Sequence, residues 1–172
     1  RDWSSDVCSS DLYLRKTWGD QRTETWLQKM SKQDVKISSA SIRNVLDLVG
    51  AGEYPMLING AMHHVGQSKA SGAPVDATMV DPVLARNGYI VMLNTSPHPA
   101  ASMLLIDFLL DDTAQNILKA EAFYPARPDI PPLDEMKAYT PVAKGYKQFP
   151  VDDQMIFDLG KSSMEMFTKY FQ

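Results

Sequence analysis

The sequence predicts an α/β domain built around a mainly parallel sheet. Segments with the 3.6-residue period of helices alternate along the chain with short apolar runs that are typical of buried strands. The composition agrees, because 44% hydrophobic and 22% charged residues in a chain of 172 are ordinary for one globular domain. We therefore expect helices to cover the faces of a sheet.

Helical patterns occupy much of the first 72 residues. One runs over 13–33, and Gly19 is expected to divide it into two helices. Another helix is expected directly after Ser41, a good N-cap residue, with Gly50 near its end. A shorter helix is expected over 62–72.

Three segments are interpreted as strands, namely 54–60, 74–80 and 87–93. The first is apolar and ends in Asn-Gly, the second alternates, and the third is nearly all apolar and therefore expected at the centre of the sheet. In such sheets, ligands bind beyond the carboxyl ends of strands and at helix amino ends. This rule points to SSAS at 38–41 and NGAMH at 59–63.

Residues 96–123 predict two consecutive helices. The first is expected to begin near Pro99 and to carry one apolar stripe, made of Ala101, Leu104, Leu105, Phe108 and Leu109. Asp112 and Gln115 have capping-box spacing, so the second is expected to start there and to bury Ile117 and Leu118.

The end of the chain divides into an irregular and a helical part. The four prolines of 124–132 lack amide donors and exclude regular structure there. A last helix follows, with Met164, Phe167 and Phe171 on one face.

Charge and composition exclude several classes of function. The net charge is −4 without a basic stripe, so no nucleic-acid partner is expected. No apolar run reaches membrane-spanning length. Beyond Cys8 the chain has no cysteine, which excludes disulfides, thiolate metal sites and cysteine nucleophiles in the rest of it.

The candidate chemical groups each have a plainer interpretation. His63 and His64 point about 100° apart on a helix, so they rarely bind one metal ion together. His98 suits a helix cap better than catalysis, and the serines of 38–41 either bind an anion or cap a helix. Since the chain has no G-x-S-x-G, G-x-G-x-x-G or P-loop motif, neither catalysis nor a cofactor is expected.

Four stretches spanning residues 45–130 point to a family: GAGEYP, SKASGAPVD, PHPAASMLLIDFLLDDTAQ and ARPDI. In this order they resemble the C-terminal half of an ABC-importer solute-binding protein of the ferric-iron-binding branch. The resemblance implies a type II periplasmic-binding-protein fold, in which two α/β lobes close on a ligand. It implies a periplasmic or extracellular protein, monomeric when complete, that delivers a small-molecule or anionic solute to ABC permease subunits.

The resemblance also implies a division of the chain and a site. Residues 13–74 would belong to the second lobe, 75–82 to a hinge crossing segment, and 83–172 to the returning first lobe and C-terminal helices. Ligand contacts would come from two loops, which in this chain contain Ser39, Ser41, Asn59, Gly60, Ala61, Met62 and His63. Alternatives are an extracellular sensor domain of the same fold, or an α/β hydrolase that uses His63 or His98.

The site departs from the ferric-binding pattern at two positions. Ala61 and Met62 stand where such members place two adjacent tyrosines. A ferric ion prefers anionic oxygen ligands, which neither side chain supplies. We therefore expect a small organic or phosphorylated solute, held without a metal.

Residues 1–12 differ in composition from the rest of the chain. They form a polar stretch, and DWSSDVCSSDL matches the translation of a sequencing-library adapter. We therefore expect residues 1–12 to be foreign to the natural protein. A complete member would have a signal peptide and most of its first lobe ahead of residue 13.

Overall fold

The computed structural model describes residues 5–85, 88–150 and 153–171. Helices dominate these residues, and they contain one pair of strands. In chain order the elements are α1 (Ser5–Trp18), α2 (Asp20–Met30), α3 (Ile42–Gly50), α4 (Met62–Ala70), β1 (Val83–Ala85), α5 (Pro99–Leu109), α6 (Asp112–Ala120), α7 (Asp134–Lys137), the 3₁₀ helix η1 (Val142–Lys144), β2 (Gln148–Pro150) and α8 (Asp153–Phe171).

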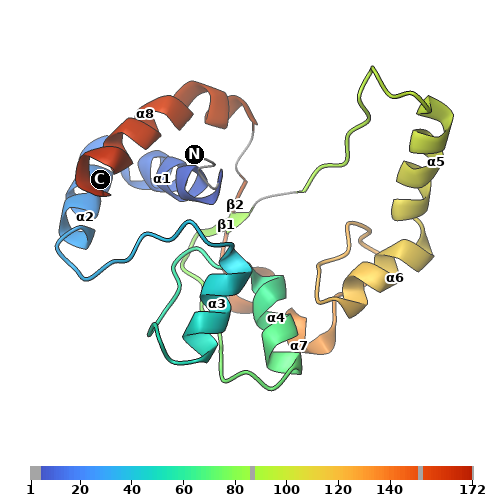
Figure 1. The fold of residues 1–172 in the computed structure, drawn as a ribbon, viewed down its shortest axis with the longest axis horizontal. Helices are drawn as coiled ribbons and strands as arrows, with labels where there is room; N and C mark the ends of the chain where they lie inside the picture. The colour runs from blue at the N-terminus through green and yellow to red at the C-terminus, as the bar shows by residue number, and fades with distance from the viewer. Residues whose placement is uncertain (1–4, 86–87, 151–152, 172) are drawn as a thin grey trace.

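The helices form three groups around the two strands (Figure 1). The first and last helices, α1, α2 and α8, pack together, and α4 packs between α3 and α7. The third group, α5 and α6, lies to one side at the end of an extended segment. Each group is held mainly by contacts among its own helices.

The first group confirms the predicted break at Gly19. This residue lies between α1 and α2 with φ of 79°, a conformation that glycine adopts without strain. Arg15 of α1 then reaches α8, where it donates hydrogen bonds of 2.8 Å to both Ser162 and Ser163. In α8, Phe167 is buried and stacks on Phe171, as the predicted apolar face requires.

The secondary structure does not change at residue 12. Helix α1 runs from Ser5 to Trp18 and therefore crosses the boundary between the polar stretch and the rest of the chain. Leu12 is fully buried, and its neighbours Tyr13 and Leu14 are more than nine-tenths buried. Residues 1–4 lie outside the described residues.

The second group contains a compact apolar cluster. Leu46 of α3, Val65 of α4 and Val75 are buried against one another, and partly buried residues surround them: Val49, Leu57, Ala73 and Ala77. Helix α3 starts and stops where the sequence predicts, and α4 starts at Met62 as predicted but ends at Ala70, whereas α7 was not predicted. Ser41 Oγ accepts a hydrogen bond of 3.2 Å from the Asn44 amide, so it caps α3 as expected.

The prediction of three strands is wrong. Residues 54–60 form bends and turns, and 74–80 have no strand pairing although burial alternates there. In the third segment Asn87 lies outside the described residues, and 88–93 are exposed and unpaired instead of central. The described sheet is a parallel pair, in which Val83 lies opposite Gln148 and Ala85 opposite Pro150.

The third group keeps its predicted helices but not their burial. Helix α5 begins at Pro99 as expected, yet none of its residues is buried, so the predicted stripe does not face a core. Helix α6 is capped one residue earlier than predicted, because Asp111 Oδ1 accepts the Ala114 amide at 2.9 Å. Ile117 is 57% exposed, and the residues that α6 buries are Ala114 and Gln115.

Candidate functional site

The amino end of α4 holds five of the seven predicted ligand residues. Asn59 has φ of 66°, a left-handed conformation that asparagine tolerates better than most residues. Ala61 is the N-cap, and its methyl group makes no hydrogen bond to the helix. Since the first turn of a helix leaves its amides without helical partners, those of Met62 and His63 can donate to a bound polar group.

His63 is fixed by aromatic contacts in this first turn. Its ring stacks on Phe123 with centroids 4.2 Å apart and planes at 20°, and it also lies 4.1 Å from the ring of His64. Burial lowers the pKa of His63, and the adjacent His64 lowers it further. The lower pKa favours the neutral form of the ring, which offers an aromatic surface with hydrogen-bonding nitrogens.

Helix α4 also contains buried polar side-chain atoms without a described hydrogen-bond partner. Among the described residues, the buried side-chain atoms without a hydrogen-bond partner are His64 Nδ1 and Ser68 Oγ. Ser68 is only 4% exposed. Buried groups of this kind cost stability, so α4 is not optimised for stability alone.

The amino end of α3 holds the other two predicted residues. Ser41 Oγ is engaged by the Asn44 amide, and the neighbouring Ser38 Oγ accepts the Ala40 amide at 3.1 Å. Ser39 is exposed in the loop before the helix. The capping interpretation is therefore confirmed for Ser41.

A polar chain connects α3, α4 and the segment after α6. Arg43 Nη1 donates to Gln67 Oε1 at 2.9 Å, and Gln67 Nε2 donates to the Glu121 carbonyl at 2.8 Å. Side chains also pack closely against the α4 backbone here, since a Cβ at Gly66 would lie 2.5 Å from Met136 Sδ and 2.9 Å from Ala122 Cβ. The segment after α6 is therefore part of the surroundings of the predicted site.

The sequence did not predict that the segment after α6 contributes to the surroundings of His63. Phe123 contacts His63 although the two residues are far apart in the chain. The available signal was the aromatic pair Phe123 and Tyr124, which lies shortly after α6 and directly before a proline. The described contacts of Ser41 and of His63 lead to different neighbours, so they do not join the α3 and α4 ends into one site.

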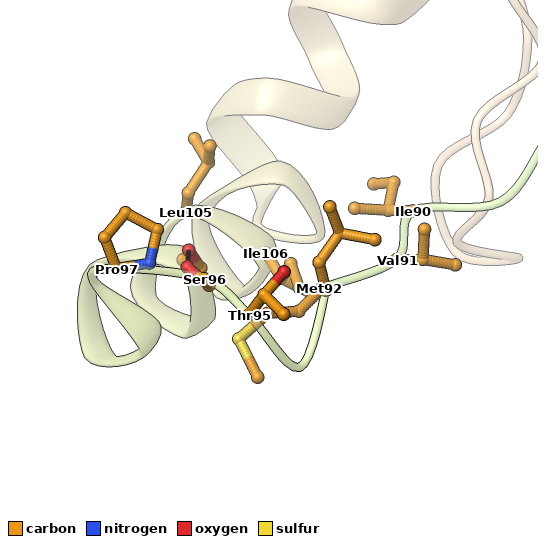
Figure 2. Close-up of a pocket in the computed structure, with 10 residues that line it drawn as sticks. Ile90, Val91, Met92, Thr95, Ser96, Pro97, Leu105 and Ile106 are labelled. Atoms are coloured by element: carbon orange, nitrogen blue, oxygen red, sulfur yellow. Dashed lines mark hydrogen bonds between the residues drawn. The ribbon is translucent and has the colours of Figure 1, made fainter.

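The described hollows of the surface lie elsewhere, along α5. One of about 330 Å³ lies between the extended segment and α5, with Ile90, Met92 and Leu105 among its lining residues (Figure 2). A second, of about 670 Å³, adjoins it at Leu105 and includes Phe108. Both are mainly apolar and contain none of the predicted ligand residues.

The described residues contain neither a metal-binding cluster nor a helix able to span a membrane. Within residues 5–85, 88–150 and 153–171, no three His, Cys, Asp or Glu side chains are grouped so that they could hold a metal ion. No helix in these ranges has both the length and the apolar character needed to cross a bilayer.

The fold is rich in helices and contains a small parallel sheet and a polar helix end. These features are consistent with part of an α/β binding protein. The chain belongs to the family described as bacterial extracellular solute-binding protein, which matches residues 6–116, more than half of its length. The match begins inside the polar stretch 1–12. No curated protein and no solved structure matches the chain.

Membership defines the general function. Proteins of this family bind a small solute outside the cytoplasm, act with the permease of an ABC importer, and are in general not enzymes. The family alone names neither the solute nor the residues that contact it.

Proposed function

We propose that this protein captures a small anionic solute for an ABC importer at the amino ends of α3 and α4. The observation that carries the general function is the family match over residues 6–116. The contacts would come from Ser39, Ser41, Asn59, Gly60, Ala61, Met62 and His63. The solute would lie between a lobe formed by 13–74 and one formed by 83–172, with 75–82 as the hinge between them.

The chemistry of the α4 end supports an anion. The amides of Met62 and His63 lie at the positive end of the helix dipole, and the cap residue Ala61 does not occupy them. The ring nitrogens of His63 add hydrogen-bonding groups beside these amides. Ala61 and Met62 provide no anionic oxygen, so a ferric ion is not the proposed cargo.

The test is an amide NMR titration of the full chain with inorganic phosphate, a dicarboxylate and ferric citrate as separate probes. We expect one of the first two to shift the signals of residues 59–63 most strongly. The variant Asn59→Gly removes the side chain and keeps a residue that adopts positive φ, so it should weaken binding without strain.

The matched control is Asn116→Ala, whose side chain donates a hydrogen bond within α6, to the Asp112 carbonyl. It should leave the titration unchanged. Shifts centred outside 38–41 and 59–63, or equal affinity in Asn59→Gly and wild type, would contradict the proposed site. If only ferric citrate bound, the anionic solute would be wrong while the family function stood.

A further inference from the structure

A short turn from the third group docks on the helix that carries the proposed site. We call it the docking turn: Glu121–Phe123, which directly follows α6. Helices α5 and α6 pack mainly against each other, whereas α4 packs between α3 and α7. The contacts of the docking turn with α4 are therefore tertiary contacts between two groups of helices.

The backbone of the docking turn has a conformation that is unusual for its sequence. Ala122 has φ of 61°, and the turn ends α6 through hydrogen bonds from the Phe123 amide to the Leu118 carbonyl at 3.0 Å and from the Ala122 amide to the Lys119 carbonyl at 2.9 Å. Glycine is the usual residue at such a helix end. A residue with a side chain persists there only when the surrounding structure fixes it.

Two contacts fix the docking turn on α4. Ala122 is 4% exposed, and its methyl group lies against Gly66, where a Cβ would come within 2.9 Å of it. Gln67 Nε2 donates to the Glu121 carbonyl at 2.8 Å, while its Oε1 accepts from Arg43 Nη1 at 2.9 Å. Because both ends of this amide are engaged, Gln67 holds the turn in one place.

A third contact reaches the proposed site. The Phe123 ring stacks on His63, which lies four residues before Gln67 and therefore on the same face of α4. Phe123 itself is 38% exposed, so its ring covers His63 without being enclosed. A side chain that is free to change rotamer must be ordered when it binds a ligand, which costs affinity. Stacking on Phe123 orders the His63 ring beforehand.

We propose that the docking turn positions His63 for the solute: Gln67 and Gly66 fix the turn on α4, and Phe123 holds the imidazole ring at the amino end of the helix. Phe123 and Gln67 are thus positioning residues, which act through His63. The inference rests on the proposed function, because it takes the solute to bind at this helix end. In the proposed division of the chain, the same contact joins the part 83–172 to the part 13–74.

NMR of the His63 ring in the full chain tests the positioning without a ligand. In Phe123→Ala the ring protons should lose the shift caused by the stacked ring, and the pKa of His63 should rise toward 6.5, because burial lowers it in wild type. Gln67→Met should change both in the same direction. Phe123→Tyr keeps a stacked ring and should retain the wild-type values. Phe157→Ala, which changes a phenylalanine 84% exposed on α8, is the matched control.

Titration of the same variants with inorganic phosphate and, separately, with a dicarboxylate tests the effect on binding. Phe123→Ala and Gln67→Met should weaken the anion that wild type binds about two- to tenfold, the usual cost of immobilising one side chain. Phe123→Tyr and Phe157→Ala should bind as wild type does. If Phe123→Ala changed the far-ultraviolet circular dichroism, Phe123→Leu, which keeps an apolar side chain without a ring, would decide by the same criteria.

Three outcomes would overturn the positioning role alone: unchanged His63 signals in Phe123→Ala, unchanged affinity although those signals move, or equal loss of affinity in Phe157→Ala. Weaker binding in Gln67→Met without a change at His63 would refute the part assigned to Gln67. An absence of anion-induced shifts at 59–63 in wild type is a different result. It would refute the proposed solute site itself, and the positioning role with it.

Discussion

Contacts with Tyr139 and Lys69 strongly lower the pKa of the exposed Asp76 carboxyl. Tyr139 donates its hydroxyl hydrogen to Asp76 Oδ1, and Lys69 Nζ lies 2.7 Å from the tyrosine oxygen and 3.2 Å from the carboxylate. The tyrosine, then the Ala77 amide and Lys69, lower the pKa of Asp76 from 3.8 to about 2. All of these contacts favour the ionised carboxylate.

This pKa gives a prediction with a definite sign. Because the folded state lowers the pKa, the stabilisation by ionised Asp76 is complete above its unfolded value of 3.8 and disappears as the pH falls toward 2. In Tyr139→Phe the pKa should rise part of the way to 3.8, since Ala77 and Lys69 remain. Carboxyl NMR measures it, with Tyr146→Phe as the control. An Asp76 pKa that stays near 2 without the Tyr139 hydroxyl would contradict the assignment.

Individual helices were predictable where their ends depend on local chemistry. Ser41, Gly19 and Pro99 each mark an end through a cap, a left-handed turn or a fixed φ, and all three act within a few residues. Strands were not predictable in this way, because a strand needs a partner for its backbone groups. The apolar residues 88–93 have the right composition, but no other segment of the described chain pairs with them.

The tight packing of Ala122 and Met136 against Gly66 of α4 predicts how a substitution there changes stability. Gly66→Ala should destabilise the protein by about 1–3 kcal/mol, because the new methyl group would overlap the Ala122 Cβ and the buried Met136. Gly160→Ala in α8 is the matched control. Its nearest neighbour would be 3.9 Å away, so helix propensity should make it stabilising by about 0.5–1 kcal/mol. Urea unfolding compares the two, and equal effects of the same sign would contradict this packing.

At the scale of the whole molecule, the first and last helices depend on one charged residue. The Arg15 side chain is 8% exposed and donates to Asp20, Ser162 and Ser163. Ser163 is fully buried. A buried charge is tolerated here because all three guanidinium nitrogens donate hydrogen bonds: Nε and Nη2 to Asp20, and Nη1 to Ser162 and Ser163.

Replacement of Arg15 should therefore weaken the attachment of α1 to α8. We expect Arg15→Met to lose about 1.5–3 kcal/mol, because hydrogen bonds to a charged group disappear and the hydroxyl of Ser163 loses its partner. Lys16→Met removes an exposed positive charge from the next position and should change stability much less. Chemical denaturation of the two variants measures the difference, and similar midpoints would show that the arginine contacts do not hold the helices together.

The candidate site was predictable as two stretches and not as an assembled surface. Asn59–His63 follow from the rule that places ligands at helix amino ends, and the structure puts them at the start of α4. The ring that covers His63 comes from Phe123, whose position depends on how α6 and the following segment return to α4. That return is a tertiary contact, which no local pattern in the sequence encodes.

The parallel pairing of β1 with β2 has a consequence for how the protein tolerates change. It closes residues 86–147 into a loop, with α5 and α6 inside it and the two strands at its base. Closure entropy grows only with the logarithm of loop length, so even doubling such a loop costs about 0.6 kcal/mol. Insertions between β1 and α5 should therefore be accommodated at little thermodynamic expense, whereas a cut in either three-residue strand would open the base of the loop and leave it attached through Glu121 and α7, which contact α4.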